Sequence, residues 1–356
     1  MNKDDIYLPT AMEDLKGKAL TVLGPVTPGD LGHTLPHEHI LVNGSPFATE
    51  PHSIRGLPIT METLGQIRYY PYSVMANLKL DIPEELTSEL RLFKSAGGGC
   101  VCDVTVTGIR CQPGPELLPQ ISRESGVHII TGTGYYVNSF LPDYAKSLSS
   151  NQMAEQMYSE IVGGCEGGVR CGVIGEIGCS YPLINSEKTA LQAAAMVQTR
   201  TGAPLIVHPG RHGDAPAEIA SILESHGGDL SRTVMSHLDR TFNDDQSLLK
   251  FARMGCLLEY DLFGIECSHY QLSSAADMPS DAQRIQRIKV LIDNGFADKI
   301  LISHDIHTKV RLARYGGHGY SHIVEHIMPK MVSRGIPQEV VSAITKDNPQ
   351  KWLTFV

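Results

Sequence analysis

The sequence contains no run of lysine and arginine, and its formal net charge is -9 at pH 7. Proteins that bind nucleic acid neutralise phosphates with clustered basic side chains, so we expect no nucleic acid partner. No uninterrupted apolar run approaches the roughly 18 residues that cross a bilayer. The first segment, MNKDDIYLPTAMEDLKGK, has no basic stretch followed by an apolar core. We therefore expect a soluble, cytoplasmic protein with no membrane partner and no signal peptide.

The sequence also lacks the CxxC spacing that zinc ribbons and redox motifs use, although it contains eight cysteines. Most of these cysteines lie in apolar, strand-like segments such as GCVCDV and GCLLEY. Buried free thiols in a reducing compartment account for this distribution better than disulfides or a zinc site. The eight residues are Cys100, Cys102, Cys111, Cys165, Cys171, Cys179, Cys256 and Cys267.

The apolar content is sufficient for a large core, because 42% of the 356 residues are hydrophobic and 19% are charged. Nearly continuous apolar runs, typical of buried parallel strands, alternate with amphipathic segments such as DIPEELTSELRLFKSAGGG. That segment has a proline near its start and glycines at its end, as helices do. The expected strands are residues 34–42, 99–106, 128–136, 171–178, 204–210, 233–239, 256–264 and 300–307.

This alternation, repeated about eight times, predicts an α/β protein built as a (β/α)8 TIM barrel. A doubly wound open sheet is the alternative, but it requires a glycine-rich phosphate-binding turn after the first strand, and HEHILVNGSP is not one. No linker rich in proline or serine divides the chain. We predict a single domain over residues 1–356, with a short β extension at 1–30, the barrel at 31–356 and a long loop at 43–80 over the barrel mouth.

The segment TLPHEHILVNG places His37 and His39 two residues apart in the first expected strand. Residues i and i+2 of a strand point to the same side, so both imidazoles can bind one metal ion. The alternative is two separately hydrogen-bonded histidines near a strand end, because an isolated HxH segment does not identify a metal site.

Further candidate ligands lie near the carboxyl ends of other expected strands, where barrel active sites are built. They are Glu176, His208, His237 and Asp305. Considered singly, Glu176 could be an ion-paired core acid, His208 a packing residue and Asp305 a helix cap. Together with His37 and His39 they form a ligand set that suits Zn2+, Mn2+, Fe2+ or Co2+. Since one ion would not use so many ligands of this kind, the set predicts two divalent metal ions, with Zn2+ as the first expectation.

Characteristic motifs extend over almost the whole chain, namely TVLGPVTPGDLGHTLPHEH, GVIGEIGCSYPL, VHPGR, VMSHLDRT, LEYDLFG, HDIHTK and YGGHGYSHI. With these motifs the chain resembles the phosphotriesterase-like branch of the amidohydrolase superfamily, and within it the phosphotriesterase-related proteins of animals. Phosphotriesterase itself has a carboxylated lysine between its metals, and this sequence departs from it by offering Glu176. A carboxylate bridge is preserved, but the departure puts organophosphate turnover in doubt.

The resemblance assigns each candidate ligand a role. His37, His39 and Asp305 would hold the more buried metal, His208 and His237 the more exposed one, and Glu176 would bridge them. The cations would lower the pKa of a shared water, and the resulting hydroxide would attack the substrate carbonyl. Asp305 would accept the proton of this water and return it to the leaving amine.

The resemblance further implies a metal-dependent amidohydrolase acting on small N-acyl amino compounds, first of all on N-acetyltaurine with release of taurine and acetate. Lactone, ester or phosphotriester hydrolysis is the alternative chemistry. A metal-binding protein without catalysis is the alternative from another class. The resemblance also implies a homodimer, although no sequence feature specifies an interface.

The small-molecule substrate would be recognised by side chains that follow the strand ends. Arg211 and Arg240 each follow a candidate ligand histidine by three residues, so either guanidinium could hold an anion or form a surface salt bridge instead. Tyr136 could donate to the oxyanion or belong to the core. Asp261 could contact the substrate or the ligands from behind. Histidines that we leave outside the ligand set are His304, His307, His318 and His322.

Overall fold

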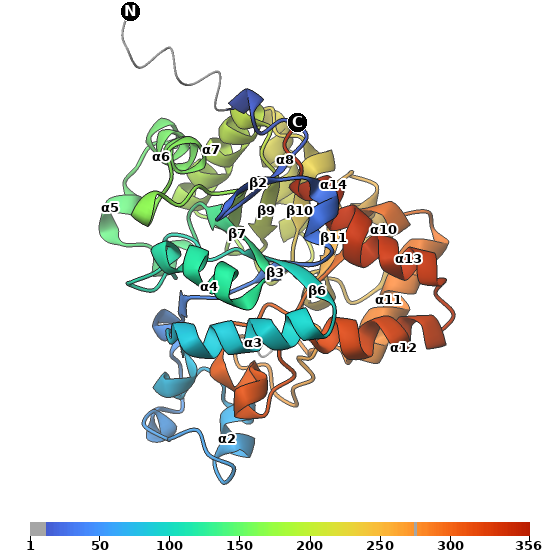
Figure 1. The fold of residues 1–356 in the computed structure, drawn as a ribbon. Coiled ribbons are helices and arrows are strands. Elements are labelled where there is room, and N and C mark those ends of the chain that lie inside the picture. The colour runs from blue at the N-terminus through green and yellow to red at the C-terminus, as the bar shows by residue number, and fades with distance from the viewer. Residues whose placement is uncertain (1–11, 274–275) are drawn as a thin grey trace, which may run out of the picture.

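Eight parallel strands form the centre of the computed structural model, which describes residues 12–273 and 276–356. They are hydrogen-bonded in the order β12-β11-β10-β9-β8-β7-β6-β3, and the sheet curls into a nearly closed barrel (Figure 1). This arrangement confirms the predicted TIM barrel. The strands are β3 (His33–Glu38), β6 (Gly98–Asp103), β7 (His128–Thr133), β8 (Val173–Gly178), β9 (Leu205–His208), β10 (Thr233–Met235), β11 (Leu257–Tyr260) and β12 (Ile300–Ile302).

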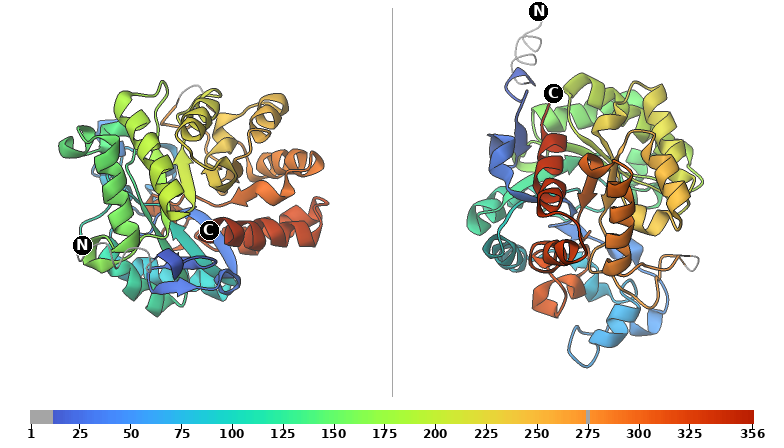
Figure 2. Two further views of the ribbon diagram at one scale, coloured as in Figure 1. Left: turned by 90° about the horizontal axis from the view of Figure 1, so that it is seen from above. Right: turned by 90° about the vertical axis from the view of Figure 1, so that its right-hand side faces the viewer.

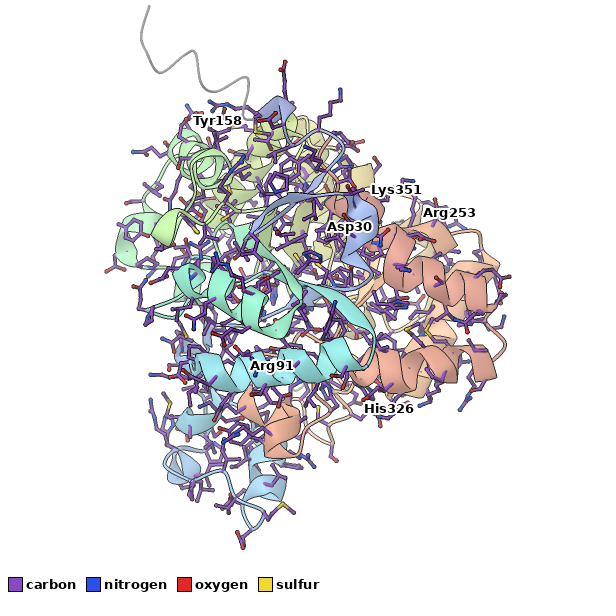
Figure 3. All side chains as sticks on the ribbon, in the orientation of Figure 1. Asp30, Arg91, Tyr158, Arg253, His326 and Lys351 are labelled. Carbon is purple, nitrogen blue, oxygen red and sulfur yellow. The ribbon has the colours of Figure 1, made fainter. Side chains whose placement is uncertain are left out.

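Helices surround the strands on the outside, which Figure 2 shows in two further views. Charged side chains on and beside the helices face solvent, as the exposed Arg91, Arg253 and Lys351 illustrate (Figure 3). No helix in the described part of the chain is both long and apolar enough to cross a bilayer. The α-helices that follow the strands or their loops are α3 (Pro83–Ser95), α4 (Leu118–Ser125), α5 (Asp143–Lys146), α6 (Ser150–Val162), α7 (Asn185–Thr201), α8 (Ala215–Ser225), α9 (Leu238–Thr241), α10 (Asp245–Ala252), α11 (Asp281–Asp293), α12 (Met328–Ser333), α13 (Gln338–Ser342) and α14 (Asn348–Leu353).

Each expected strand overlaps an observed one, but most observed strands end earlier. The strand expected at 233–239, for example, ends at Met235. The chain turns here because His237 has a left-handed backbone conformation with φ 57°, and α9 begins at the next residue. The candidate ligand therefore lies in a turn after the strand and not within it.

The apolar residues form an outer layer and a barrel interior. The outer layer packs helices against the strands and includes Phe93, Leu191 and Ile288. The interior is filled by side chains from successive strands. Trp352 of α14 packs against them at the end of the barrel opposite the carboxyl ends of the strands. Residues that fill the interior are Cys100, Cys102, Val104, Ile130, Val173, Ile206, Val234, Leu257 and Leu301. All eight cysteines are free thiols, and each is buried except Cys165 and Cys267.

The segment before the barrel contains an antiparallel hairpin of β1 (Ala19–Thr21) and β2 (Gly24–Val26), as expected. The long loop after β3 contains α2 (Leu64–Tyr69) and an antiparallel pair of β4 (Val42–Asn43) and β5 (Lys79–Leu80). This loop lies at the opposite end of the molecule from the C-terminus (Figure 1). Its apolar side chains form a small separate core with Val310, a residue of the loop that follows β12.

The barrel has a seam between β3 and β12, the two ends of the sheet. Within the described residues, no ladder of backbone hydrogen bonds joins these strands. Instead the Asp305 N–H donates to the His37 carbonyl at 3.2 Å, and the His37 N–H donates to Ser303 Oγ at 3.2 Å. Closure of the barrel at this edge therefore depends on a few contacts after the end of β12.

Candidate metal centre

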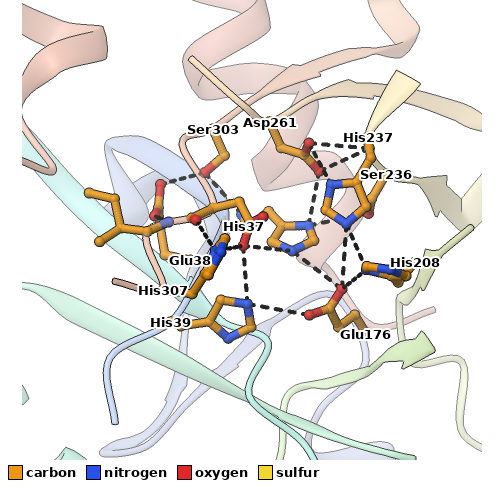
Figure 4. Close-up of polar contacts among 12 residues, drawn as sticks. His37, Glu38, His39, Glu176, His208, Ser236, His237, Asp261, Ser303 and His307 are labelled. Atoms are coloured by element: carbon orange, nitrogen blue, oxygen red, sulfur yellow. Dashed lines mark hydrogen bonds and ion pairs between the residues drawn. The ribbon is translucent and has the colours of Figure 1, made fainter. Parts of the chain in front are cut away.

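Glu176 of β8 lies at the centre of a cluster of four imidazoles at the barrel mouth (Figure 4). Its Oε2 atom is 3.1 Å from His208 Nδ1, 3.5 Å from His37 Nε2 and 3.8 Å from His237 Nε2. Its Oε1 atom is 3.3 Å from His39 Nε2. One buried carboxylate thus faces nitrogen atoms from four different side chains, which is the arrangement a bridging ligand needs.

Asp305 completes the cluster from the loop after β12. Its Oδ1 atom is 3.2 Å from His39 Nε2 and 3.9 Å from His37 Nε2. The ligand atoms of His37, His39 and Asp305 all lie within 4.8 Å of one another, as do those of His37, Glu176 and His237. The structure therefore brings together all six residues that the sequence singled out, five of them in these two groups and His208 through its contact with Glu176.

Three histidines of the cluster use their Nδ1 atoms for outer contacts, so their Nε2 atoms face the centre of the cluster, where His237 Nε2 lies 2.8 Å from His208 Nδ1. The His37 Nδ1 atom is 3.0 Å from Glu259 and 3.1 Å from Asp261, and the His237 Nδ1 atom is 2.8 Å from Asp261. The His39 Nδ1 atom is 2.9 Å from the Thr105 hydroxyl. Outer partners of this kind orient metal-binding imidazoles and fix their tautomer.

The His37 Nε2 atom is buried and has no hydrogen-bond partner among residues 12–273 and 276–356. A buried polar atom without a partner costs free energy, so this nitrogen requires a ligand that the polypeptide does not supply. It faces the two carboxylates Glu176 and Asp305. A pair of divalent cations fits this position, because neutral imidazoles and carboxylates are the ligands such ions prefer.

Both carboxylates and His208 have the protonation states that metal binding requires. Burial alone would raise the pKa of Glu176, but His37 and the other histidines hold it well below its usual range. Burial would likewise raise the pKa of Asp305, which His307 and His39 keep well below its usual range. Burial and the neighbouring His237 lower the pKa of His208 to about 3. Two ionised carboxylates and a neutral imidazole are the forms in which these groups coordinate metals. Despite burial, the neighbouring carboxylates raise the pKa of His37, His39 and His237, so a cation would replace protons at these nitrogens.

The backbone is strained at two of the candidate ligands. His237 and Asp305, with φ 57° and 54°, are the only non-glycine residues of positive φ in the part of the chain that the structure describes. Such conformations cost on the order of 1–3 kcal/mol and persist where the surrounding structure holds them. Both turns aim a side chain at the same point above the strands.

Glu38 has a role that our sequence analysis missed. It lies between the two histidines of the HxH segment and crosses the seam of the barrel. Its Oε1 atom accepts hydrogen bonds from the Ser303 hydroxyl at 2.8 Å and the His304 N–H at 2.9 Å, and lies 2.7 Å from His304 Nδ1. Its Oε2 atom accepts from the Ile306 N–H at 2.9 Å. The only signal in the sequence was a lone acidic residue in an apolar strand.

Of the two roles considered for Asp261, contact with the substrate or contact with the ligands from behind, the structure supports the second. The Asp261 carboxylate is buried behind the ligands and bonded to His37 and His237, and it is not among the residues that line the cavity at the mouth. Glu259, another residue missed in the sequence, lies beside it against His37. Both acids therefore contact the histidines from behind.

The other predicted contact residues line the cavity in front of Glu176. The Tyr136 hydroxyl is 3.4 Å from His208 Nδ1. Arg211 and Arg240 also line this cavity, and Phe47 and Tyr72 of the long loop lie over it, as the sequence predicted for that loop. The cavity thus combines the cluster with a hydroxyl, two guanidinium groups and aromatic walls.

Among the histidines outside the ligand set, His307 lies nearest to the centre. Its Nδ1 atom is 3.1 Å from Asp305 Oδ1, and its Nε2 atom is 2.8 Å from the Tyr72 hydroxyl. His304 contacts Glu38 instead, and its ring stacks on that of His318. His322 is bonded to Asp281 on the outer side.

Comparisons with known proteins agree with this geometry. The model of the Phosphotriesterase family matches residues 17–353. N-acetyltaurine hydrolases of Danio rerio and Homo sapiens are 48% and 46% identical to the chain, and each match covers 97% of the chain and 100% of the relative. A resiniferatoxin-binding protein of Rhodobacter sphaeroides superposes with a TM-score of 0.90 at 32% identity, over 95% of both chains. A lactonase of Listeria monocytogenes shares the fold, with a TM-score of 0.75 at 23% identity over 95% of this chain and 99% of its own.

Proposed function

The chain belongs to the phosphotriesterase family and is a metal-dependent hydrolase, and from this premise we propose that it cleaves N-acetyltaurine to taurine and acetate. The proposal rests on one observation above all. The cluster centred on Glu176 is complete in a chain that is 46–48% identical, over its whole matched length, to proteins named for this activity. The free cysteines support a reducing compartment such as the cytoplasm.

Six side chains would hold two divalent cations, with zinc as the first expectation. His37, His39 and Asp305 would hold one cation, His208 and His237 would hold the other, and Glu176 would contribute an oxygen atom to each. When bound, such cations supply Lewis acidity, which lowers the pKa of a water molecule and polarises a carbonyl group.

The remaining chemistry belongs to the side chains of this chain. The Asp305 carboxylate, which its neighbours keep ionised, accepts a proton from the attacking water and returns it to the amine as the C–N bond breaks. Burial keeps the pKa of Tyr136 well above its usual range, so its hydroxyl retains a proton for donation to the substrate oxygen. Phe47 and Tyr72 exclude water above the centre.

Two measurements test the proposal together. Elemental analysis of protein purified without chelator should find about two divalent ions per chain. A panel of N-acetyltaurine, N-acetylglycine, γ-butyrolactone and a phosphotriester should give the highest kcat/KM for N-acetyltaurine. Removal of the ions by a chelator should abolish this activity, and Zn2+ or Mn2+ should restore it.

The panel also decides between the candidate activities. A higher kcat/KM for the lactone would replace our proposal by lactone hydrolysis. Protein without metal, and without any gain on adding Zn2+ or Mn2+, would contradict the two-metal centre. Glu155→Gln is a suitable control, because Glu155 is an exposed acid paired with Arg200 on the helical surface.

A further inference from the structure

The guanidinium group of Arg240 is buried at the cavity wall without a carboxylate partner. Its side chain belongs to α9, only 5% of the residue is exposed, and no acidic oxygen of the described residues lies within 4.0 Å of it. The Nη2 atom donates to the Pro209 carbonyl at 3.1 Å and lies 3.4 Å from His208 Nε2. The Nη1 atom is buried and has no hydrogen-bond partner in the described part of the chain.

Two other arginines whose guanidinium groups are buried, Arg284 and Arg110, are paired with acids. Arg284 binds Asp239 at 2.9 Å and Asp281 at 2.8 Å, and Arg110 contacts Glu160 at 3.4 Å. A buried charge without such a partner carries a desolvation cost that nothing offsets. Arg240 therefore differs from these arginines in a way that points to a ligand.

Arg211 adds a second positive charge to the same cavity. Its Nε atom donates to the Tyr270 hydroxyl at 2.7 Å, and no carboxylate of the described residues lies within salt-bridge distance of it. Arg211 is exposed at the rim and Arg240 is buried, and both line the cavity in front of Glu176. Two cations that repel one another in one cavity are stabilised by an anion between them.

We propose that Arg240, assisted by Arg211, binds the anionic group on the amine side of the substrate and thereby determines the specificity of the enzyme. The anion is a sulfonate or a carboxylate, since either presents oxygen atoms to a guanidinium in a forked contact. This inference rests on the proposed amide hydrolysis and adds a substrate class to it.

The position of His208 indicates the length of that substrate. Its ring lies between the two sites, because Nδ1 faces Glu176 and Nε2 faces Arg240. One imidazole width thus separates the anion from the reacting centre, and two or three bonds of about 1.5 Å span it. Spacers of one or two carbon atoms between the amide nitrogen and the anion match this separation.

The kinetic test compares two substrates with the same spacer, N-acetyltaurine and the uncharged N-(2-hydroxyethyl)acetamide. The ratio of their kcat/KM values should fall at least 30-fold in Arg240→Met, since a charge-assisted hydrogen bond is lost for the anion only. Arg240→Lys, which keeps the charge but not the fork, should lower the ratio less. If Arg240→Met does not fold, the ratio of kcat/KM values measured for Arg240→Lys tests the proposal in its place.

Arg232→Met is the matched control. Arg232 precedes β10, whereas Arg240 follows this strand. The Arg232 Nη2 atom donates to backbone carbonyls such as that of Trp352, at the opposite end of the barrel from the cavity. The substrate ratio of this variant should equal that of the wild type. A wild-type ratio in both Arg240 variants would overturn the proposal.

A binding measurement separates this inference from the proposed function. Ethanesulfonate should bind the purified wild-type protein in a calorimetric titration and should bind Arg240→Met at least 30-fold more weakly. Wild-type protein that does not cleave N-acetyltaurine but shows this difference would refute the substrate and support the anion site. Equal affinity in the two proteins would refute the anion site even if N-acetyltaurine is cleaved.

Discussion

Replacing Glu38 by glutamine should loosen the barrel at its seam and weaken the metal centre at the same time. The carboxylate accepts from the Ser303 hydroxyl, the His304 backbone and the Ile306 backbone, and it also faces His304 Nδ1. It is fully buried, so water cannot replace any of these partners. The same three residues flank Asp305, which contributes to the cluster.

The size of the effect follows from which oxygen atom the amide group replaces. The Oε1 atom has three partners and Oε2 has one, so the glutamine would keep its oxygen at Oε1 and place its NH2 group against the Ile306 N–H. Two donors would then face each other in the interior, at a cost of about 1–3 kcal/mol. The substitution also removes the negative charge of Glu38 beside His304 Nδ1. Together the two effects should lower the free energy of unfolding by about 2–4 kcal/mol.

Urea unfolding and a metal competition titration measure the two consequences. We expect a lower midpoint with an unchanged slope, and a metal affinity reduced about 10- to 100-fold because the supports of Asp305 have moved. Glu89→Gln is the matched control, since Glu89 is a buried acid that accepts from the Ala313 and Arg314 N–H groups away from the seam. It should lower stability and leave metal affinity unchanged.

The reasoning is refuted if Glu38→Gln unfolds within about 0.5 kcal/mol of the wild type and binds metal equally well. It is also refuted if Glu38→Gln and Glu89→Gln weaken metal binding to the same extent, because the seam would then have no special role.

Further predictions concern the cluster and the stability in acid. Glu176→Gln should lower metal content and turnover together, since an amide has only one oxygen atom to offer; elemental analysis showing unchanged content would make Glu176 a structural acid. Asp305→Asn, assayed with saturating metal, should lose about 100- to 10,000-fold in kcat and much less in metal affinity; a rate within a few-fold of the wild type would assign the proton to another group. The pKa of Asp281 is about 2, because hydrogen bonds from His322 and Gly264 N–H and the charge of Arg284 outweigh the effect of burial. Since its folded pKa is below the usual 3.8, Asp281 stabilises the fold above about pH 4, and on the order of 2 kcal/mol is lost as the pH falls through 2. Urea unfolding of Asp281→Asn should depend less on pH between 5 and 2 than that of the wild type, and an equal dependence would contradict this assignment.

The sequence by itself determined the barrel and the residues at its mouth. Continuous apolar strands alternating with capped helices have few other solutions, and parallel strands bring all their carboxyl ends to one side. For this reason His37, Glu176, His208 and Asp305 could be expected to meet although they are far apart in the chain. Local patterns and one rule of topology were sufficient.

Only the tertiary structure decided what surrounds those residues. Glu38 meets Ser303, 265 positions later, across a seam that no periodicity marks. Asp261 lies behind the histidines, and Arg240 has no acidic partner among the residues that the structure describes, because of how loops from separate strands pack together. Hydrogen bonding of a buried polar group depends on every neighbour in space, whereas the sequence specifies only its neighbours along the chain.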